Sequence, residues 1–108
     1  LHEIAERSGV GMRLEEDAIP VAPAVQGACE MLGLDPLHVA NEGKLVAVVD
    51  GAHADAALAA LRAHPAAGPD AARIGTVTDD AGRLVARTAL GATRVIAPAL
   101  GEQLPRIC

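Results

Sequence analysis

Apolar side chains recur at helical spacing in three places along the chain. The first pattern opens the sequence and stops at Gly9, and the second covers residues 21–33. The third covers residues 53–64, is rich in alanine and stops before Pro65. The second pattern places Cys29 among core side chains, where it acts as a small hydrophobic residue. Its apolar positions follow the i, i+3, i+4, i+7 rule of an amphipathic helix: Val25, Ala28, Cys29 and Leu32.

Two apolar patterns between these helices predict strands of different kinds. Met12 and Leu14 alternate with charged residues, which is typical of a strand with one exposed face. Residues 44–49 read Lys-Leu-Val-Ala-Val-Val, a nearly continuous apolar run. Such a run predicts a central strand that is buried on both faces.

The last third of the chain predicts further strands. Residues 72–78 and 83–88 flank the turn sequence Asp-Asp-Ala-Gly at 79–82, and this pattern predicts a β-hairpin. Gly91 permits another reversal before a final strand over residues 93–97. Together the patterns predict an α+β fold, a mixed sheet of four to five strands with helices packed on it.

The polar segments between these patterns contain one helix-capping signal, and their residues do not have the spacing of metal ligands. Residues 15–17 are all acidic and predict a solvated turn, since three consecutive acids cannot all converge on one metal ion. Asp35 followed by Pro36 is the N-cap and N1 signature of a short helical turn that runs through His38. None of the four histidines pairs with a Cys or His at ligand spacing, so all are expected at the surface or its boundary.

Composition excludes several classes of protein. At 108 residues the chain is one domain, and it contains no Phe, Tyr or Trp, so its core must be aliphatic. Without aromatic rings it cannot stack bases, and fourteen acidic against nine basic residues give the wrong charge for phosphate backbones. No apolar run approaches the ~18 residues of a membrane span. We expect a soluble, cytoplasmic protein with neither nucleic acid nor membrane as partner. Leu1 enters a helical pattern without a start methionine, which indicates a piece of a longer protein.

The sequence ends in Pro-Arg-Ile-Cys, with a thiol on Cys108. The ten residues after Pro98 can extend about 33 Å, at ~3.3 Å each, so the thiol can visit another surface. This indicates a nucleophile or carrier on a flexible arm. Two other interpretations are an incidental cysteine and a disulfide with Cys29. Prenylation is excluded, because it requires the cysteine four residues from the end.

Three stretches carry a resemblance to a known family. Residues 101–108, 4–11 and 39–47 are similar to the HypE family of hydrogenase expression/formation proteins. The last two stretches also resemble the C-terminal domain of the wider AIR synthase-related, PurM-like superfamily, so only the tail is specific to HypE. The resemblance covers essentially the whole chain. It implies an AIR synthase-related domain over residues 1–98, a flexible tail over residues 99–108, and an upstream ATP-binding domain that is absent here.

The resemblance implies a carrier function in assembly of the nickel-iron hydrogenase centre. Cys108 matches the position at which HypE proteins accept a carbamoyl group from HypF. The full-length protein, as a carbamoyl dehydratase, converts the loaded group with ATP to a thiocyanate and delivers cyanide to iron on a HypC–HypD complex. A homodimer of the full-length protein is also implied. This sequence has neither a P-loop nor a GxGxxG motif, so ATP is expected to bind mainly to the absent domain. The fragment alone is expected to be inactive, with no cofactor of its own.

Dehydration needs a base, because the amide nitrogen loses its protons as the triple bond forms. Glu42 is the candidate, since it lies in a loop similar to the family's; the alternative is that it only orients the tail. Asn41 and Gly43 beside it are interpreted as a plain turn. Arg106 is expected to dock the tail on an acidic partner, to steady negative charge or to be solvated. The tail-docking residues are Pro105, Arg106 and Ile107.

Two other functions remain open. One is a metallochaperone in which Cys108 and a histidine deliver nickel or zinc, although the lack of a CxxC or HxH cluster counts against it. The other is the accessory domain of a different PurM-like ATP-dependent enzyme, with an incidental terminal cysteine. The upstream sequence would distinguish such an enzyme from a HypE protein, because each PurM-like enzyme has its own phosphate-binding residues there.

Overall fold

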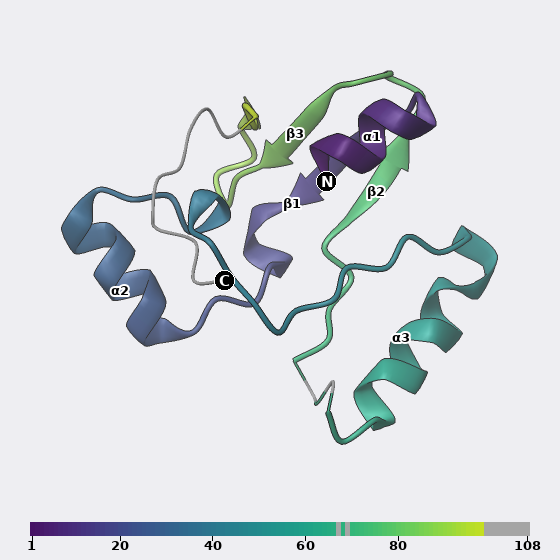
Figure 1. Ribbon diagram of the computed structural model, residues 1–108, viewed down its shortest axis with the longest axis horizontal. Coiled ribbons are helices and arrows are strands. Elements are labelled where there is room, and N and C mark those ends of the chain that lie inside the picture. The colour runs from purple at the N-terminus through teal and green to yellow at the C-terminus, as the bar shows by residue number, and fades with distance from the viewer. Residues whose placement is uncertain (67, 69, 99–108) are drawn as a thin grey trace.

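The computed structural model describes residues 1–66, 68 and 70–98, and Figure 1 shows their arrangement. The helices of this part are α1 His2–Ser8, α2 Pro23–Leu32 and α3 Ala54–Ala63, with short 3₁₀ helices η1 Glu16–Ala18, η2 Pro36–His38 and η3 Gly51–His53. The strands are β1 Gly11–Glu15, β2 Gly75–Thr78, β3 Leu84–Arg87 and β4 Thr93–Val95. The three predicted helices and the predicted short turn through His38 are confirmed.

Helix α1 leads into β1 through a left-handed glycine. Gly9 has φ 63° and ψ 31°, a conformation that a side chain disfavours. The N–H group of Val10 then donates to the Ala5 carbonyl at 3.0 Å, which satisfies one of the last carbonyls of the helix. This turn lays α1 against the sheet, where Ala5 is 1% exposed.

The four strands form one mixed sheet in the order β2-β1-β3-β4. Strand β1 runs antiparallel to β2 and parallel to β3, and β3 runs antiparallel to β4. This confirms the predicted α+β fold with a mixed sheet of four to five strands. The predicted hairpin between residues 72–78 and 83–88 is wrong, because β1 lies between the two strands.

The connection from β2 to β3 crosses over the start of β1. The N–H group of Gly82 donates to the Val10 carbonyl at 3.0 Å. A Cβ atom on Gly11 would collide with the backbone carbonyl oxygen of Asp80 and lie 2.9 Å from that of Arg83. Because glycine has no side chain, Gly11 leaves room for the connection to cross β1. The predicted turn at 79–82 therefore lies in a connection that crosses β1, and it does not close a hairpin.

Replacing Gly11 by alanine is expected to lower the free energy of unfolding by about 3 kcal/mol, because the added methyl group overlaps backbone atoms. Gly27 in α2 provides the control, since a Cβ atom there meets nothing within 4 Å. Gly27→Ala is expected to raise the free energy of unfolding by up to ~1 kcal/mol through helix propensity. Urea denaturation followed by circular dichroism measures both variants, and an unchanged midpoint for Gly11→Ala would contradict the crossing.

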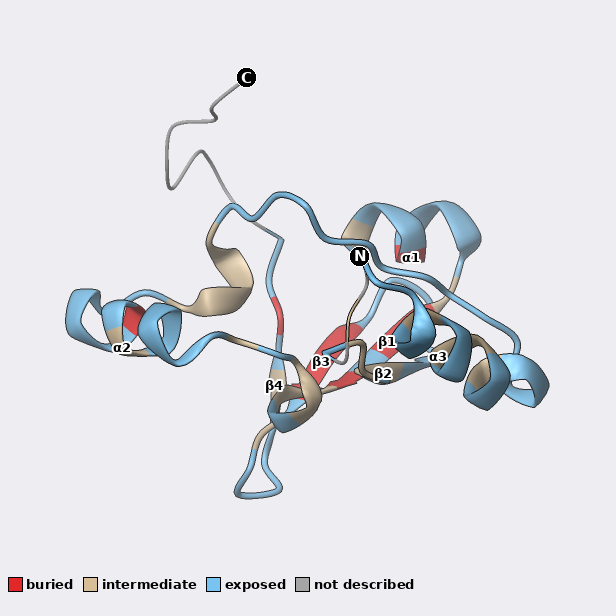
Figure 2. Ribbon diagram, turned by 90° about the horizontal axis from the view of Figure 1, so that it is seen from below, coloured by how far each residue is buried: buried red, intermediate tan, exposed pale blue. Residues whose placement is uncertain are grey.

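The buried core lies along β1 and β3 and beneath α1, as the red segments in Figure 2 show. Met12 and Leu14 are buried while Arg13 between them is exposed, so β1 has the one exposed face that its alternation predicts. Partly buried residues from outside the sheet also contact the core, including Leu37 of η2. The buried cluster consists of Ala5, Met12, Leu14, Leu84, Ala86 and Ile96.

Residues 44–49 depart most from the sequence prediction. They form no strand, and no strand of the described sheet pairs with them. Leu45 is 77% exposed and Val48 is 56% exposed, so the prediction of a buried central strand is wrong. The physical reason is that β1 and β3 occupy the central positions of the sheet and supply its core. In Figure 1 the segment is a connection from η2 toward α3.

Helices α2 and α3 lie away from the main core, on opposite sides of the view in Figure 1. Of the apolar stripe predicted on α2, Cys29 is buried whereas Val25 and Leu32 are exposed. The predicted stripe of α3 is partly buried, with Leu58 and Leu61 among its members. No helix within the described ranges is long and apolar enough to span a membrane.

Candidate functional site

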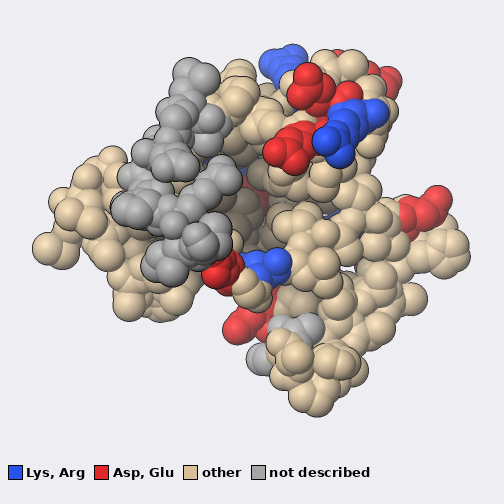
Figure 3. All heavy atoms as spheres, viewed as in Figure 1, with Lys and Arg blue, Asp and Glu red and all other residues tan. Residues whose placement is uncertain are grey.

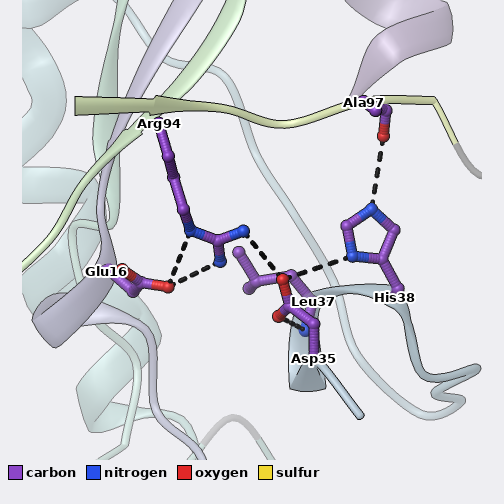
Figure 4. Close-up of polar contacts among 6 residues, drawn as sticks. All are labelled: Glu16, Asp35, Leu37, His38, Arg94 and Ala97. Carbon is purple, nitrogen blue, oxygen red and sulfur yellow. Dashed lines mark hydrogen bonds and ion pairs between the residues drawn. The ribbon is translucent and has the colours of Figure 1, made fainter. Parts of the chain in front are cut away.

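Arg94 on β4 joins two carboxylates that lie far away in the sequence (Figure 4). Its Nη2 donates to Glu16 Oε1 at 2.6 Å, and its Nη1 donates to Asp35 Oδ2 at 2.8 Å. Glu16 lies in η1 and Asp35 precedes η2, so one guanidinium ties β4 to two short helical turns. These charge-assisted hydrogen bonds, first to Glu16 and then to Asp35, raise the pKa of Arg94 above its ordinary value.

Asp35 also caps η2, as the sequence predicts. Its Oδ1 accepts the N–H group of Leu37 at 2.9 Å. Burial alone would raise the pKa of Asp35, but the hydrogen bonds from Leu37 and Arg94 outweigh burial and hold the pKa below its ordinary value of 3.8. The carboxylate therefore stays charged throughout the neutral range.

Replacing Asp35 by asparagine tests this interaction through the pH dependence of stability. A carboxyl group whose pKa is lower in the folded protein stabilises the fold above its unfolded pKa and loses that effect as pH falls through the folded value. At pH 7 the wild type is expected to exceed Asp35→Asn by about 1 kcal/mol in free energy of unfolding. This difference should shrink below pH 3.8.

Urea denaturation at neutral and acidic pH measures the difference between wild type and Asp35→Asn. Asp17→Asn is the control, since Asp17 belongs to η1 and is exposed. It should show little effect at any pH, as expected of an exposed surface position. A wild-type advantage over Asp35→Asn that persists unchanged into strong acid would contradict the charged interaction.

His38 extends the network to the end of the described chain. Its Nδ1 lies 3.4 Å from Asp35 Oδ2, and its Nε2 lies 3.3 Å from the carbonyl oxygen of Ala97. The side chain is 20% exposed, which confirms the expected boundary position. Figure 4 shows the ring between the carboxylate and the backbone of Ala97.

A hollow of about 390 Å³ lies beside the network, between η1, the start of α2 and η2. Its lining includes three carboxylates, those of Glu16, Asp17 and Asp35, together with the apolar side chains of Ile19 and Leu37. Carboxylates repel a triphosphate, and Arg94 nearby is already engaged by two of them. The hollow therefore does not fit ATP.

Charged side chains on the face drawn in Figure 3 gather mainly over α1, where both signs are mixed. Helix α1 carries Glu3, Glu6 and Arg7 within seven residues. Two acidic side chains and one basic side chain leave α1 with a small net negative charge, so this helix exerts only a weak field on a charged partner.

The predicted loop follows η2 directly. Asn41, Glu42 and Gly43 are all exposed, and Gly43 has φ 71°, the left-handed geometry of a turn glycine. The interpretation of Gly43 as a turn residue is thus confirmed. Glu42 lies four residues after His38, so the same short turn carries the network and leads into the predicted base.

The predicted carrier residue and its docking residues lie outside the described residues. These are Pro105, Arg106, Ile107 and Cys108. The structure describes the residues just before that segment, where Ile96 is buried and its N–H group donates to the Leu84 carbonyl at 2.9 Å. Ala97, the next residue, is the one that His38 contacts.

Sequence reasoning missed the pairing of Glu16 with Arg94. The interpretation of residues 15–17 as a solvated turn is wrong for Glu16, which bonds a side chain 78 positions away. No local pattern marks such a pair. The one signal in the sequence was the capping position of Asp35, and capping accounts for only one of its two oxygens.

Cys29 is a free cysteine that is 4% exposed, which confirms its predicted place among buried side chains. Burial shields its thiol from water and from large reagents. Within residues 1–66, 68 and 70–98, no group of three or more His, Cys, Asp or Glu side chains could hold a metal ion.

Over residues 1–87 the chain matches the family described as AIR synthase related protein, C-terminal domain. Over its whole length it is 60% identical to Carbamoyl dehydratase HypE of Cupriavidus necator. It is 58% identical to the protein of the same name from Bradyrhizobium diazoefficiens. The chain spans 31% of each of these proteins, so it covers about a third of the length of the curated relatives it matches.

Solved structures share the fold. A crystal structure of the hydrogenase maturation protein HypE is 47% identical, with a TM-score of 0.91 over all of this chain and 36% of that one. HypE in complex with ATP is 46% identical, with a TM-score of 0.87 over all of this chain and 33% of that one. A HypE–HypF complex is 40% identical, with a TM-score of 0.85 over 92% of this chain and 32% of that one.

Proposed function

This chain belongs to the family of AIR synthase related proteins, whose C-terminal domain it matches, and on that premise we propose that it is the carrier part of a hydrogenase maturation protein of the HypE type. The proposal divides it into a domain over residues 1–98 and a carrier segment over residues 99–108. The observation that carries it is the 60% identity to Carbamoyl dehydratase HypE, over a match that includes Cys108.

The first step is loading of Cys108. Its thiolate attacks the carbonyl carbon of an activated carbamoyl group, a sulfur–carbon bond forms, and the bond from that carbon to the donor's leaving group breaks. The thiol proton goes to solvent or to a base, and the product is a thiocarbamate on the protein. The donor is HypF, charged from carbamoyl phosphate; the solved HypE–HypF complex supports this partner.

The second step is dehydration of the thiocarbamate, which belongs to the full-length protein. ATP phosphorylates the carbonyl oxygen, that oxygen departs with the phosphate, and the nitrogen loses both protons as the carbon–nitrogen triple bond forms. Glu42 is the base in this proposal, since it is an exposed carboxylate on the loop after η2. ATP binds mainly outside this chain, because the acidic hollow here does not suit a triphosphate.

The carrier segment then presents the cyanide for transfer to the active-site iron on a HypC–HypD complex. Pro105, Arg106 and Ile107 form its docking residues, with one positive charge and two apolar side chains next to Cys108. Arg106 suits an acidic surface, and Ile107 suits an apolar one. The full-length protein is proposed to act as a homodimer.

The test is intact-protein mass spectrometry after incubation with HypF, carbamoyl phosphate and ATP. The chain is examined alone and as a chimera, in which it replaces the matching third of the Cupriavidus necator relative. We expect the gain of one carbamoyl group, or in the chimera of its dehydrated thiocyanate form, located by peptide mapping on the C-terminal peptide. Gain by the chimera alone would mean that the rest of the protein supplies recognition. Absence of gain in both forms, or a group on another peptide, would overturn the carrier function.

A further inference from the structure

We propose that His38 is a positioning residue that fastens the chain just before the carrier segment to η2, by joining the carboxylate of Asp35 to the backbone carbonyl of Ala97. This inference rests on the proposed function, because it gives His38 a role in placing Cys108. It concerns residues outside the predicted chemical site, and the sequence marks His38 only as a boundary histidine.

The contact lies at the last described attachment of the chain before the carrier segment. Ile96 is 7% exposed and its N–H group bonds to β3, so the backbone is held firmly at that residue. Ala97 is exposed, yet its carbonyl oxygen lies 3.3 Å from His38 Nε2. Pro98 follows and has no N–H group to donate. His38 therefore adds one residue of attachment beyond the sheet, just before the carrier segment.

The carboxylate behind the ring is itself fixed. Asp35 receives hydrogen bonds from Leu37 N–H and from Arg94, and Arg94 is held in turn by Glu16. Asp35 is the charged group that contacts His38, and Arg94 and Glu16 lie behind it in the same network. The carboxylate of Asp35 thus holds one side of the His38 ring in place, and Nε2 on the other side faces the carbonyl oxygen of Ala97.

The contact at Ala97 needs an N–H group on His38 Nε2, because the carbonyl oxygen of Ala97 can only accept. The neutral Nε2–H tautomer and the protonated ring both carry that group. The carboxylate of Asp35 lies 3.4 Å from Nδ1, on the other side of the ring, and supports it there.

The same turn leads to the proposed base. Glu42 follows His38 by four residues, so η2 carries both the attachment of the carrier segment and the loop that holds the carboxylate. From Ala97 to Cys108 the chain can extend about 36 Å at ~3.3 Å per residue. That length is enough to reach many positions, so attaching its origin to η2, the turn that leads into the Glu42 loop, would favour an encounter between Cys108 and Glu42.

The functional test compares wild type with His38→Gln in the chimera, as single-turnover dehydration of the carbamoylated protein followed by mass. We expect the variant to be about threefold to tenfold slower, which is the usual cost of losing one hydrogen bond. His53→Gln is the matched control, because His53 faces Asp50 at the same spacing but is 78% exposed.

A geometric test is independent of carbamoyl chemistry. In the same protein, labelled selectively, the carbonyl carbon resonance of Ala97 should differ between wild type and His38→Gln and stay unchanged in His53→Gln. An Ala97 resonance that His38→Gln leaves unchanged overturns the contact. A changed resonance with an unchanged dehydration rate overturns the positioning role. Failure of wild type to load Cys108 overturns the proposed function and the positioning role with it, while the resonance still judges the contact.

Discussion

Replacing Cys108 by alanine is expected to abolish carbamoyl uptake completely. The thiol is the only group on residues 101–108 that can form a thiocarbamate, and a methyl group offers no electron pair to the carbamoyl carbon. The chain has one other cysteine, Cys29 on α2, and it is 4% exposed, so it cannot take over the reaction. Intact-mass analysis of the chimera with HypF, carbamoyl phosphate and ATP measures the uptake.

Two further variants make this result specific. Cys29→Ala should load as the wild type does, because the buried thiol has no access to the donor. Cys108→Ser keeps the size of the side chain and should load very slowly, because a hydroxyl is a much weaker nucleophile than a thiolate at neutral pH. Carbamoyl gain by Cys108→Ala at the wild-type level would place the acceptor on another residue and end the carrier interpretation.

Replacing Glu42 by glutamine is expected to leave loading intact and to slow dehydration of the loaded protein by about 10²-fold to 10⁴-fold, the usual contribution of a general base. Glutamine has nearly the same shape as glutamate but cannot accept a proton. Glu42 is exposed, so the change should alter the free energy of unfolding by no more than about 0.5 kcal/mol. Mass spectrometry of the carbamoylated chimera after addition of ATP follows the loss of water.

Glu42→Asp and Glu30→Gln serve as the matched variants. Aspartate keeps the carboxylate and should retain part of the dehydration rate, whereas an exposed acid on α2 should have no effect on it. If Glu42 only orients the tail, glutamine would support that contact nearly as well as glutamate. A dehydration rate in Glu42→Gln within a few fold of wild type would therefore reject the base and favour the orienting role.

Local features of the fold were predictable because close neighbours determine them. Gly9 and Gly33 end their helices in the left-handed conformation, and Asp35 caps the turn that Pro36 begins. Each of these features depends on backbone groups within about one helical turn. The aliphatic composition likewise required a core without aromatic rings, which β1, β3 and α1 provide.

Strand partners were not predictable in the same way. The sequence of residues 72–88 contains two strands and a proper turn, and either a hairpin or a crossing satisfies that pattern. The choice depends on β1, some sixty residues earlier, whose Gly11 leaves space for the crossing connection. Residues 44–49 have the composition of a central strand, but β1 and β3 hold the central places in the sheet.

The sequence by itself determined the three helices and their ends, the α+β class, the buried position of Cys29 and the resemblance that points to Cys108 and Glu42. Only the tertiary structure decided that β1 separates β2 from β3, that residues 44–49 are exposed, and that a network of side chains reaches Ala97, just before the carrier segment. This network includes the contact between Glu16 and Arg94, which are 78 positions apart, and the contact between His38 and Ala97, which are 59 positions apart. Such contacts depend on how helices and strands pair and cross in space, and the residues close by in the sequence do not determine that arrangement.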